Sequence, residues 1–258
     1  MTETNYQFLN TRPNPMGEPL TQLAQAQHIQ CIAAPMITTE SIDIPSIVDD
    51  VAKQSQQDHC WIFVSRTAVR EFASQLTRAE VKFSPSGLVI AVGPGTKQEL
   101  DQHFAIVSDI IVPPASNSES LLSLQALSAS FPRPVTVVKG ENGRALLHQT
   151  LQQRGYSVEL MDVYRRVTLK YSSNQVATWR ACKGIIATSV DIAEGVLSGI
   201  KQVSAESQQS FLQNTDWIVL SERIKQYLHS QGVTNNRIFV CEDADNSSII
   251  KQINQLAK

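Results

Sequence analysis

Four places in the sequence put a residue suited to starting a helix directly after a short apolar run. These residues are Ser65, Gly93, Ser189 and Ser221. The first turn of a helix has unpaired N–H groups and a partial positive charge, so it can bind a carboxylate or a phosphate. A serine at that position also commonly caps its own helix. The junctions therefore indicate either ordinary helix caps or, at the carboxyl ends of neighbouring strands, an anion-binding surface.

Four basic side chains could add charge to such a surface. Arg12 lies at the end of the first apolar run, and Arg66 lies in the first turn of a predicted helix. A guanidinium group binds a carboxylate through two hydrogen bonds and keeps its charge, while a solvated surface position is the alternative for each. Lys139 and Arg144 flank the segment 140–143, Gly-Glu-Asn-Gly. A plain turn is the favoured interpretation of that segment, and an anion contact is the alternative.

Tyr164 is the candidate for acid–base chemistry. It lies in the extended run Val158–Val167, with Arg165 and Arg166 beside it. A phenol is protonated at neutral pH, so in a cleft it could act as a general acid or orient a ligand. Tyrosine is also common in strands, where its ring is half buried, and packing is therefore the alternative role.

Several kinds of site have no support in the sequence. The four cysteines are scattered singly, and none forms a CxxC pair or lies at ligand spacing from a histidine, as the cysteines of a zinc, iron–sulfur or dithiol site would. We therefore expect buried free thiols and no metal. The glycine segments match neither the GxGxxG pattern of a dinucleotide site nor the Walker A pattern of an ATP site, so no such cofactor is expected. The five histidines lie away from the strand–helix junctions, and we assign none of them a catalytic role.

Charge and hydropathy limit the partners. The formal net charge of the 258-residue chain is −2, and no dense block of Lys and Arg occurs. That composition argues against nucleic acid as a partner. No apolar run approaches the roughly 18 residues of a membrane-spanning helix, and the first residues lack the basic and apolar regions of a signal peptide. We therefore expect a cytoplasmic protein that does not bind membranes.

The elements that must position these residues follow from the hydrophobic pattern. Short apolar runs alternate with amphipathic stretches, which predicts an α/β fold with mostly parallel strands. The predicted strands are Tyr6–Asn10, Trp61–Val64, Leu88–Val92, Asp109–Val112, Val135–Val138, Gly184–Ala187, Trp217–Leu220 and Arg237–Val240.

Two further strands are expected to be long, over Ile29–Thr38 and Ser157–Thr168. A faint internal repeat of strand, polar loop, glycine, helix and long strand suggests two related lobes. If both long strands cross between the lobes, one lobe is an insertion in the other. The prediction is then a discontinuous lobe of residues 1–36 plus 168–258, an inserted lobe of 41–163, and connector strands of about 29–40 and 157–168.

Taken together, these residues and their order resemble the bacterial uroporphyrinogen-III synthase family. The resemblance runs nearly from end to end, and no single motif carries it. It rests on Leu-Asn-Thr-Arg-Pro (9–13), Ile-Phe-Val-Ser-Arg-Thr-Ala-Val (62–69), Ala-Val-Gly-Pro-Gly-Thr (91–96), Lys-Gly-Glu-Asn-Gly-Arg (139–144), Val-Tyr-Arg-Arg (163–166), Ala-Thr-Ser (187–189) and Val-Leu-Ser-Glu-Arg (219–223). Asn10 and the pair Arg66-Thr67 depart from the family pattern, which often has an apolar residue at the first place and a small residue with Asn at the second.

The resemblance implies two flavodoxin-like α/β lobes joined by a two-stranded β-ladder, with the active site in the cleft between the lobes. It implies a lyase that closes hydroxymethylbilane, a linear tetrapyrrole rich in carboxylates, to uroporphyrinogen III with loss of water and inversion of ring D. No cofactor or metal takes part in that reaction. The chain is expected to be a monomer, with the preceding enzyme of haem biosynthesis as a further candidate partner.

The implied site has Tyr164 as the catalytic residue, which would donate a proton to the departing hydroxyl. We hypothesise that the carboxylates of the substrate bind at helix starts and to nearby side chains, with Thr11, Arg12, Ser65, Arg66, Gly93, Lys139, Arg144, Thr188, Ser189 and Ser221 as the substrate-binding residues. Because the substrate cyclises unaided to the uninverted isomer, catalysis would come chiefly from positioning. The alternative function is a non-catalytic, two-lobed binding protein or sensor for an anionic small molecule, since a fold alone does not fix function.

Overall fold

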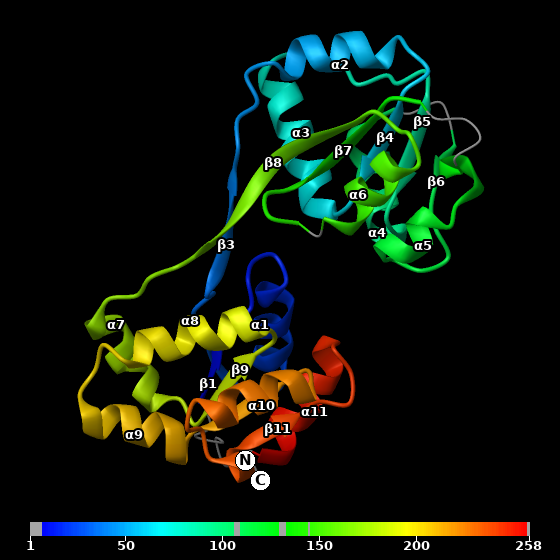
Figure 1. Ribbon diagram of the computed structural model, residues 1–258. Helices are drawn as coiled ribbons and strands as arrows, with labels where there is room; N and C mark the ends of the chain where they lie inside the picture. The colour runs from blue at the N-terminus through cyan, green and yellow to red at the C-terminus, as the bar shows by residue number, and fades with distance from the viewer. Residues whose placement is uncertain (1–6, 106–108, 129–132, 144, 257–258) are drawn as a thin grey trace. The chain divides into compact units, whose positions relative to one another are not determined.

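The computed structural model describes residues 7–105, 109–128, 133–143 and 145–256. The chain divides into two compact units, each with its own sheet and helices (Figure 1). Unit 1 consists of Met1–Thr38 and Val167–Lys258, and unit 2 consists of Thr39–Arg166. In the described part of the chain, no helix is both long and apolar enough to cross a membrane.

The sheet of unit 1 has five strands in the order β11-β10-β9-β1-β2, and all of its neighbours are parallel. These strands are β1 (Gln7–Asn10), β2 (Gln30–Ala33), β9 (Gly184–Ala187), β10 (Asp216–Val219) and β11 (Ile238–Val240). The central strands are continuous apolar runs because helices cover both faces of a parallel sheet.

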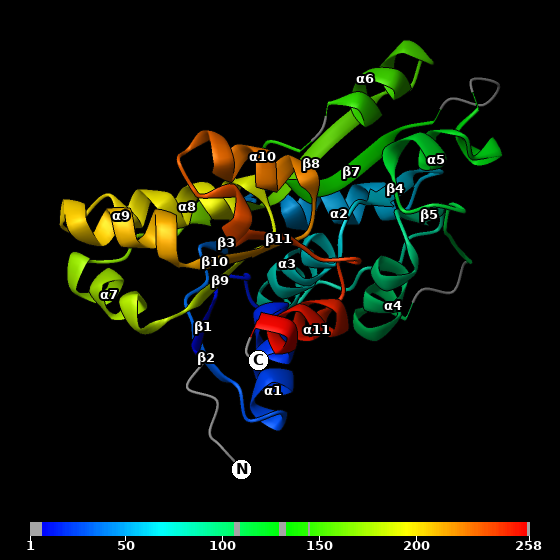
Figure 2. The ribbon, with the colours of Figure 1, turned by 90° about the horizontal axis from the view of Figure 1, so that it is seen from below.

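Two sets of helices cover those faces. On one face α1 (Gly17–Ala26) and α11 (Asn246–Leu256) lie side by side (Figure 2) and bury Phe8 of β1. The other core holds Leu9 and the helices that follow β8, β9 and β10. Those helices are α7 (Ser173–Thr178), α8 (Val190–Ile200), α9 (Ala205–Asn214) and α10 (Glu222–Ser230), with short 3₁₀ turns at Trp179–Ala181 and Asn235–Arg237.

The sheet of unit 2 has six strands in the order β3-β8-β7-β4-β5-β6. The pairs from β8 to β6 are parallel. The strands are β3 (Ile37–Ser41), β4 (Cys60–Phe63), β5 (Leu88–Ala91), β6 (Ile110–Ile111), β7 (Val135–Gly140) and β8 (Val158–Thr168). The helices are α2 (Ile47–Ser55), α3 (Arg66–Arg78), α4 (Pro94–His103), α5 (Ser118–Leu122) and α6 (Leu146–Gln153), with a 3₁₀ turn at Gln125–Leu127.

Each face of this second sheet has its own core. One contains an aromatic cluster in which Trp61, Phe72 and Phe83 pack with ring centroids 5.0–5.8 Å apart. The other packs Ile62 and Val137 against α5 and α6. The α/β class with mostly parallel sheets, predicted from the alternating pattern, is therefore confirmed.

The expectation of one strand over Ile29–Thr38 is wrong. β2 ends at Ala33 and β3 begins at Ile37, because Pro35 lies between them and has no N–H to donate to a ladder. The other long strand is present, since β8 runs for 11 residues. β3 and β8 pair antiparallel: Ile42 N donates to Val163 O at 2.9 Å, and Leu169 N donates to Met36 O at 2.8 Å.

The other predicted strands are found with ends that differ from the prediction by at most two residues, as is usual for strand boundaries. Tyr6, the predicted start of the first strand, and Arg144, a predicted binding residue, lie outside the described residues.

Candidate active site

In unit 2 the parallel register brings the carboxyl ends of β4 and β7 beside the middle of the longer strand β8. β4 lies beside β7 with Phe63 opposite Val138, and β7 lies beside β8 with Gly140 opposite Tyr164. Ser65 lies two residues beyond the end of β4. Ser65, Gly140 and Tyr164 therefore become neighbours although they are far apart in the sequence.

Tyr164 is buried, with 6% of its surface exposed, and its ring lies against Gly140. A Cβ atom on Gly140 would lie 2.5 Å from Cζ of the ring, so only glycine fits there. A bulge between Lys139 and Gly140 shifts the register at this point, and Glu141 N donates to Tyr164 O at 2.8 Å. The backbone and the ring of Tyr164 are therefore both fixed by the end of β7.

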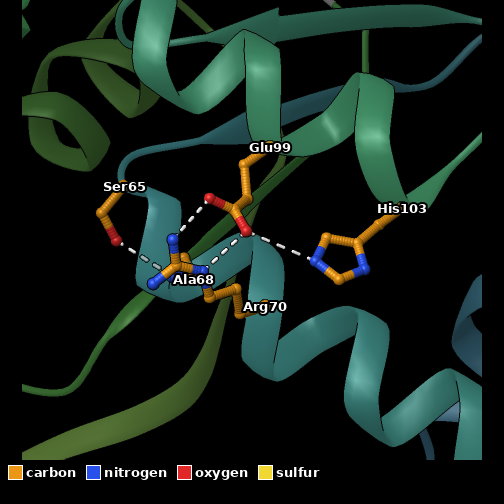
Figure 3. Close-up of polar contacts among 5 residues, drawn as sticks. All are labelled: Ser65, Ala68, Arg70, Glu99 and His103. Carbon is orange, nitrogen blue, oxygen red and sulfur yellow. Dashed lines mark hydrogen bonds and ion pairs between the residues drawn. The ribbon is translucent and has the colours of Figure 1, made fainter. Parts of the chain in front are cut away.

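Ser65 connects this tyrosine to the start of α3. Its extended backbone precedes the helix, and its Oγ accepts a hydrogen bond from Ala68 N at 3.0 Å (Figure 3). The same Oγ lies 3.3 Å from the Tyr164 hydroxyl, and either group can be the donor. Ser65 is thus a helix cap that also contacts the candidate acid, so the two interpretations of this residue are compatible.

An ion-pair cluster fixes α3 against α4 one turn further on. Arg70 Nε and Nη2 donate to the two oxygens of Glu99 at 2.6 and 2.8 Å, and His103 Nε2 lies 3.4 Å from Glu99 (Figure 3). The hydrogen bonds from Arg70 lower the pKa of Glu99, and Glu99 in turn raises the pKa of Arg70. The pair is bidentate, the geometry that best defines how two such groups lie.

The starts of α3 and α4 are neighbours. Arg66, the first residue of α3, is exposed, and a Cβ atom on Gly95 would lie 3.4 Å from its Cδ. Gly93 precedes α4, with Pro94 at the first position of the helix. A Cβ atom on Gly93 would overlap the Ser116 side chain, so a close approach of that loop explains the glycine. The structure therefore places the exposed Arg66 beside the first turn of α4, which the buried Gly93 precedes.

Lys139 is not available as a free cation. Its side chain is buried, and Nζ lies 2.5 Å from Asp162 Oδ1 on the neighbouring strand β8. No motif in the sequence marks Asp162, although its place opposite Lys139 follows once β7 and β8 are paired in parallel. An ion pair of this kind neutralises the lysine and holds the two strands in register beside the bulge.

In unit 1 the predicted residues also gather at one edge of the sheet. Thr11 and Arg12 follow β1, Thr188 and Ser189 follow β9, and Ser221 follows β10. The chain leaves β1 toward β2 on one side and continues from β9 toward β10 and β11 on the other. The β1–β9 pair is therefore the point where the strand order reverses, and ligands of open α/β sheets bind at that point.

The hydroxyls of Thr11, Ser189 and Ser221 differ in their hydrogen bonds. Thr11 is fully buried, and its Oγ1 donates to the Ile186 carbonyl. Ser189 caps α8, since its Oγ accepts from Ile192 N at 3.2 Å. Ser221 occupies the corresponding position before α10, but its side chain accepts no capping hydrogen bond. Ser221 therefore has the hydroxyl most readily offered to a ligand, and Thr11 the one least so.

Arg12 is half buried, and its contacts could not be predicted from the sequence. Its Nη1 donates to Asn246 Oδ1, and its Nε is buried without a partner among the described residues. Burial lowers the pKa of this guanidinium group. No motif marked Asn246, which is the first residue of α11 and lies 234 residues from Arg12.

The cysteines and histidines form no centre of their own. The described residues contain no group of three or more His, Cys, Asp or Glu side chains arranged to hold a metal ion. Burial raises the pKa of the thiols, to about 12 for Cys60 and Cys182 and to about 11 for Cys31 and Cys241. All four are free and protonated at neutral pH; Cys60, Cys182 and Cys241 are buried as expected, whereas Cys31 is only partly buried.

Comparisons with known proteins agree on one family. The family model described as uroporphyrinogen-III synthase HemD matches residues 18–251. The chain is 31% identical over 172 residues to the uroporphyrinogen-III synthase of Proteus mirabilis, covering 66% of this chain and 85% of that protein. It is 26% identical over 251 residues to that of Escherichia coli, covering 95% and 99%.

Solved structures support the same fold. Uroporphyrinogen-III synthetase from Helicobacter pylori superposes with a TM-score of 0.59 at 13% identity, covering 97% of this chain and 99% of that one. A mutant uroporphyrinogen III synthase from Thermus thermophilus superposes with a TM-score of 0.58 at 14% identity, with the same coverage.

Proposed function

Since the chain belongs to the uroporphyrinogen-III synthase family of tetrapyrrole biosynthesis, we propose that Tyr164 is the general acid of its reaction. The substrate that the family implies is hydroxymethylbilane, whose hydroxyl group must depart before the ring closes. Hydroxide is a poor leaving group at neutral pH, so a donor that protonates the departing oxygen lowers the barrier. The C–O bond breaks, the phenol proton leaves with the oxygen as water, and the carbon that remains is stabilised as a cation by its pyrrole nitrogen.

The contact between Ser65 and Tyr164 is the observation that carries this proposal. At 3.3 Å either hydroxyl can be the donor. When Ser65 donates to Tyr164, the phenol proton is free to point at a ligand, and the serine hydroxyl then stabilises the phenolate that forms. Packing against Gly140 fixes the ring, so the acid needs little rearrangement before it acts.

The carboxylates of the substrate are proposed to bind at helix starts and to Arg12 and Arg66, neither of which forms a salt bridge with another described residue. The starts of α3, α4, α8 and α10 present backbone N–H groups, Ser221 offers a hydroxyl, and Arg12 and Arg66 supply charge. Lys139 acts in this scheme through its ion pair with Asp162, which keeps the end of β7 in place. These groups supply position, charge and one proton, and the proposal involves no cofactor.

Replacing Tyr164 with Phe tests the acid role. The variant should form uroporphyrinogen III from hydroxymethylbilane at least about 100-fold more slowly, because general acid catalysis contributes roughly that much or more. The measurement is the initial rate of type III product, separated from the type I isomer that forms without enzyme. A wild-type rate would show that Tyr164 is not the acid.

Tyr156→Phe is the matched control. Tyr156 is also buried in unit 2, and its hydroxyl donates to Ser128 O at 2.8 Å rather than to a residue of the candidate site. This variant should lose stability and keep its rate. The same assay separates the enzyme from a non-catalytic binding protein, because only type I product from the unaltered chain would rule out synthase activity.

A further inference from the structure

Arg12 differs from most of the partly or fully buried cations among the described residues in having a neutral side-chain partner. Arg70 pairs with Glu99, Lys139 with Asp162, Arg133 with Asp58 and Arg237 with Asp216. Arg12 instead donates to the amide oxygen of Asn246. Arg154 also bonds to neutral oxygens, but these are the backbone carbonyls of Leu122 and Leu127, which no substitution of a side chain can alter.

A half-buried guanidinium group has lost part of its hydration, and without a carboxylate partner no ion pair offsets that loss of free energy. The buried Nε atom of Arg12 has no partner among the described residues, so one of its donors is also unused. An acidic side chain is close in the sequence, since Asp245 directly precedes Asn246. Its carboxylate is engaged elsewhere, because Oδ1 accepts from Ser248 N at 2.7 Å and from the Ser247 hydroxyl at 2.9 Å. The side-chain partner of Arg12 is therefore neutral at a place where a carboxylate would form an ion pair.

The position of Asn246 is itself well fixed. The turn around Asp245 holds the first residues of α11, and Ile249, Ile250 and Ile253 anchor that helix in the core of unit 1. At the other end of the contact, Arg12 N donates to Asn10 Oδ1 at 3.2 Å. The guanidinium group is thus held between the end of β1 and the start of α11, at the edge where the strand order reverses.

We propose that Asn246 is a positioning residue that orients Arg12 as an unneutralised contact for a substrate carboxylate. The inference rests on the proposed role of Arg12 in binding substrate. An amide oxygen at this position orients the guanidinium group and leaves its positive charge unpaired. A carboxylate in the same place would form an ion pair with Arg12 and so compete with a substrate carboxylate.

Asn246→Asp tests the inference, because it keeps the size of the side chain and changes only its charge. We expect the KM for hydroxymethylbilane to rise about 10-fold with little change in kcat, since a charge-assisted bond to the substrate is replaced by an internal one. Stability in urea should be equal or higher, because an acid suits both Arg12 and the first turn of α11. Asn246→Ala, which releases Arg12 without neutralising it, should raise KM by a smaller factor.

Asn254→Asp is the control for net charge. It lies on the same helix, and its amide bonds to Gln27 at 2.7 Å on an exposed surface. Its KM should match that of the unaltered enzyme at the same salt concentration. If Asn246→Asp also leaves KM unchanged, the positioning role is wrong. The role is also wrong if KM rises only together with a loss of unfolding free energy in urea.

Arg12→Gln separates this inference from the function on which it rests. If Arg12→Gln leaves KM unchanged, the proposed role of Arg12 fails. If Arg12→Gln raises KM and Asn246→Asp does not, the role of Arg12 stands and that of Asn246 fails. In the Arg12→Gln background, Asn246→Asp should add no more to KM than Asn254→Asp does, because its effect acts through the missing guanidinium group.

Discussion

The contact between Tyr164 and Gly140 makes a glycine essential to the candidate acid. A methyl group on Gly140 would lie 2.5 Å from the ring, which must then move. We expect Gly140→Ala to slow formation of uroporphyrinogen III by about 10-fold or more, because small displacements of a positioned group cost that much. The change should also destabilise the fold by about 1–3 kcal/mol through overpacking.

Gly143→Ala is the control for that substitution. A Cβ atom there would lie 3.2 Å from Cε of Lys139, a contact that a shift of a few tenths of an ångström relieves, whereas the contact at Gly140 is 2.5 Å. Rates and urea midpoints of the two variants would be compared directly. Equal rates for Gly140→Ala and the unaltered enzyme would show that the reaction tolerates a displaced Tyr164 ring. The packing of that ring against Gly140 would then not be needed for proton transfer.

His59 gives unit 2 a stability that depends on pH. Thr136 Oγ1 donates to Gln54 Oε1, so it accepts from His59 Nε2 at 2.9 Å, and the buried Nδ1 has no partner among the described residues. Burial lowers the pKa of His59 in the folded state. The unfolded chain therefore binds a proton at higher pH than the folded chain does, and stability falls as pH drops below the unfolded pKa of about 6.5.

Urea unfolding measures this effect. Between about pH 7.5 and about pH 5.5 we expect the His59 contribution to reduce stability by about 1 kcal/mol. His59→Gln keeps a side-chain N–H donor but cannot be protonated, so its stability should change less over the same interval. An unchanged pH dependence in this variant would mean that other groups determine it.

At the scale of elements, the bidentate pair of Arg70 and Glu99 is expected to hold α3 and α4 together. The Glu99 side chain is 8% exposed, so the pair is partly shielded from solvent. Glu99→Gln should cost about 1–3 kcal/mol of unfolding free energy, because it weakens charge-assisted bonds and leaves Arg70 without its counter-charge. Asp101→Asn on the same helix breaks an exposed pair with Lys97 and should cost about 0.5 kcal/mol or less. Equal losses in the two variants would contradict the anchoring role.

Most strands could be predicted because their apolar runs are short and bounded, as in Trp61–Val64 and Gly184–Ala187. The single strand expected over Ile29–Thr38 failed at Pro35. A proline interrupts hydrogen bonding locally, but which sheet each half joins depends on partners far away in the chain. Element boundaries of this kind are decided by tertiary pairing rather than by local composition.

The candidate site was predictable where it follows strand ends and not where it depends on partners. Ser65, Gly93, Ser189 and Ser221 all precede helices, as predicted. The change from a short apolar run to an amphipathic stretch marks each of these junctions in the sequence. The ion pair of Lys139 and the amide contact of Arg12 with Asn246 were not predictable, because they require the register of strands and the packing of α11. The roles of all these residues in binding stay predictions.

For the whole molecule, the separate cores of the two units predict separable unfolding. Trp61 is buried in unit 2, whereas Trp179 and Trp217 are buried in unit 1. In a Trp61→Phe background, tryptophan emission reports on unit 1, and in a Trp179→Phe/Trp217→Phe background it reports on unit 2. Adding Glu99→Gln should lower only the urea midpoint of unit 2, because no hydrophobic cluster of the described residues spans both units. Equal shifts in both backgrounds would show that the units unfold together.

β1 is an inner strand of its sheet, and this position affects the order in which the two units can fold during synthesis. Leu9 pairs with Ile32 on one side and with Ile185 on the other, so half of the neighbours of β1 are translated only after all of unit 2. Unit 2 is contiguous and can fold as it emerges from the ribosome, whereas a two-stranded sheet of β1 and β2 is marginal alone. Phe8 and Leu9 therefore reach their full burial only after β9 has been translated. A strand that is translated before the whole of unit 2 is thus completed after it.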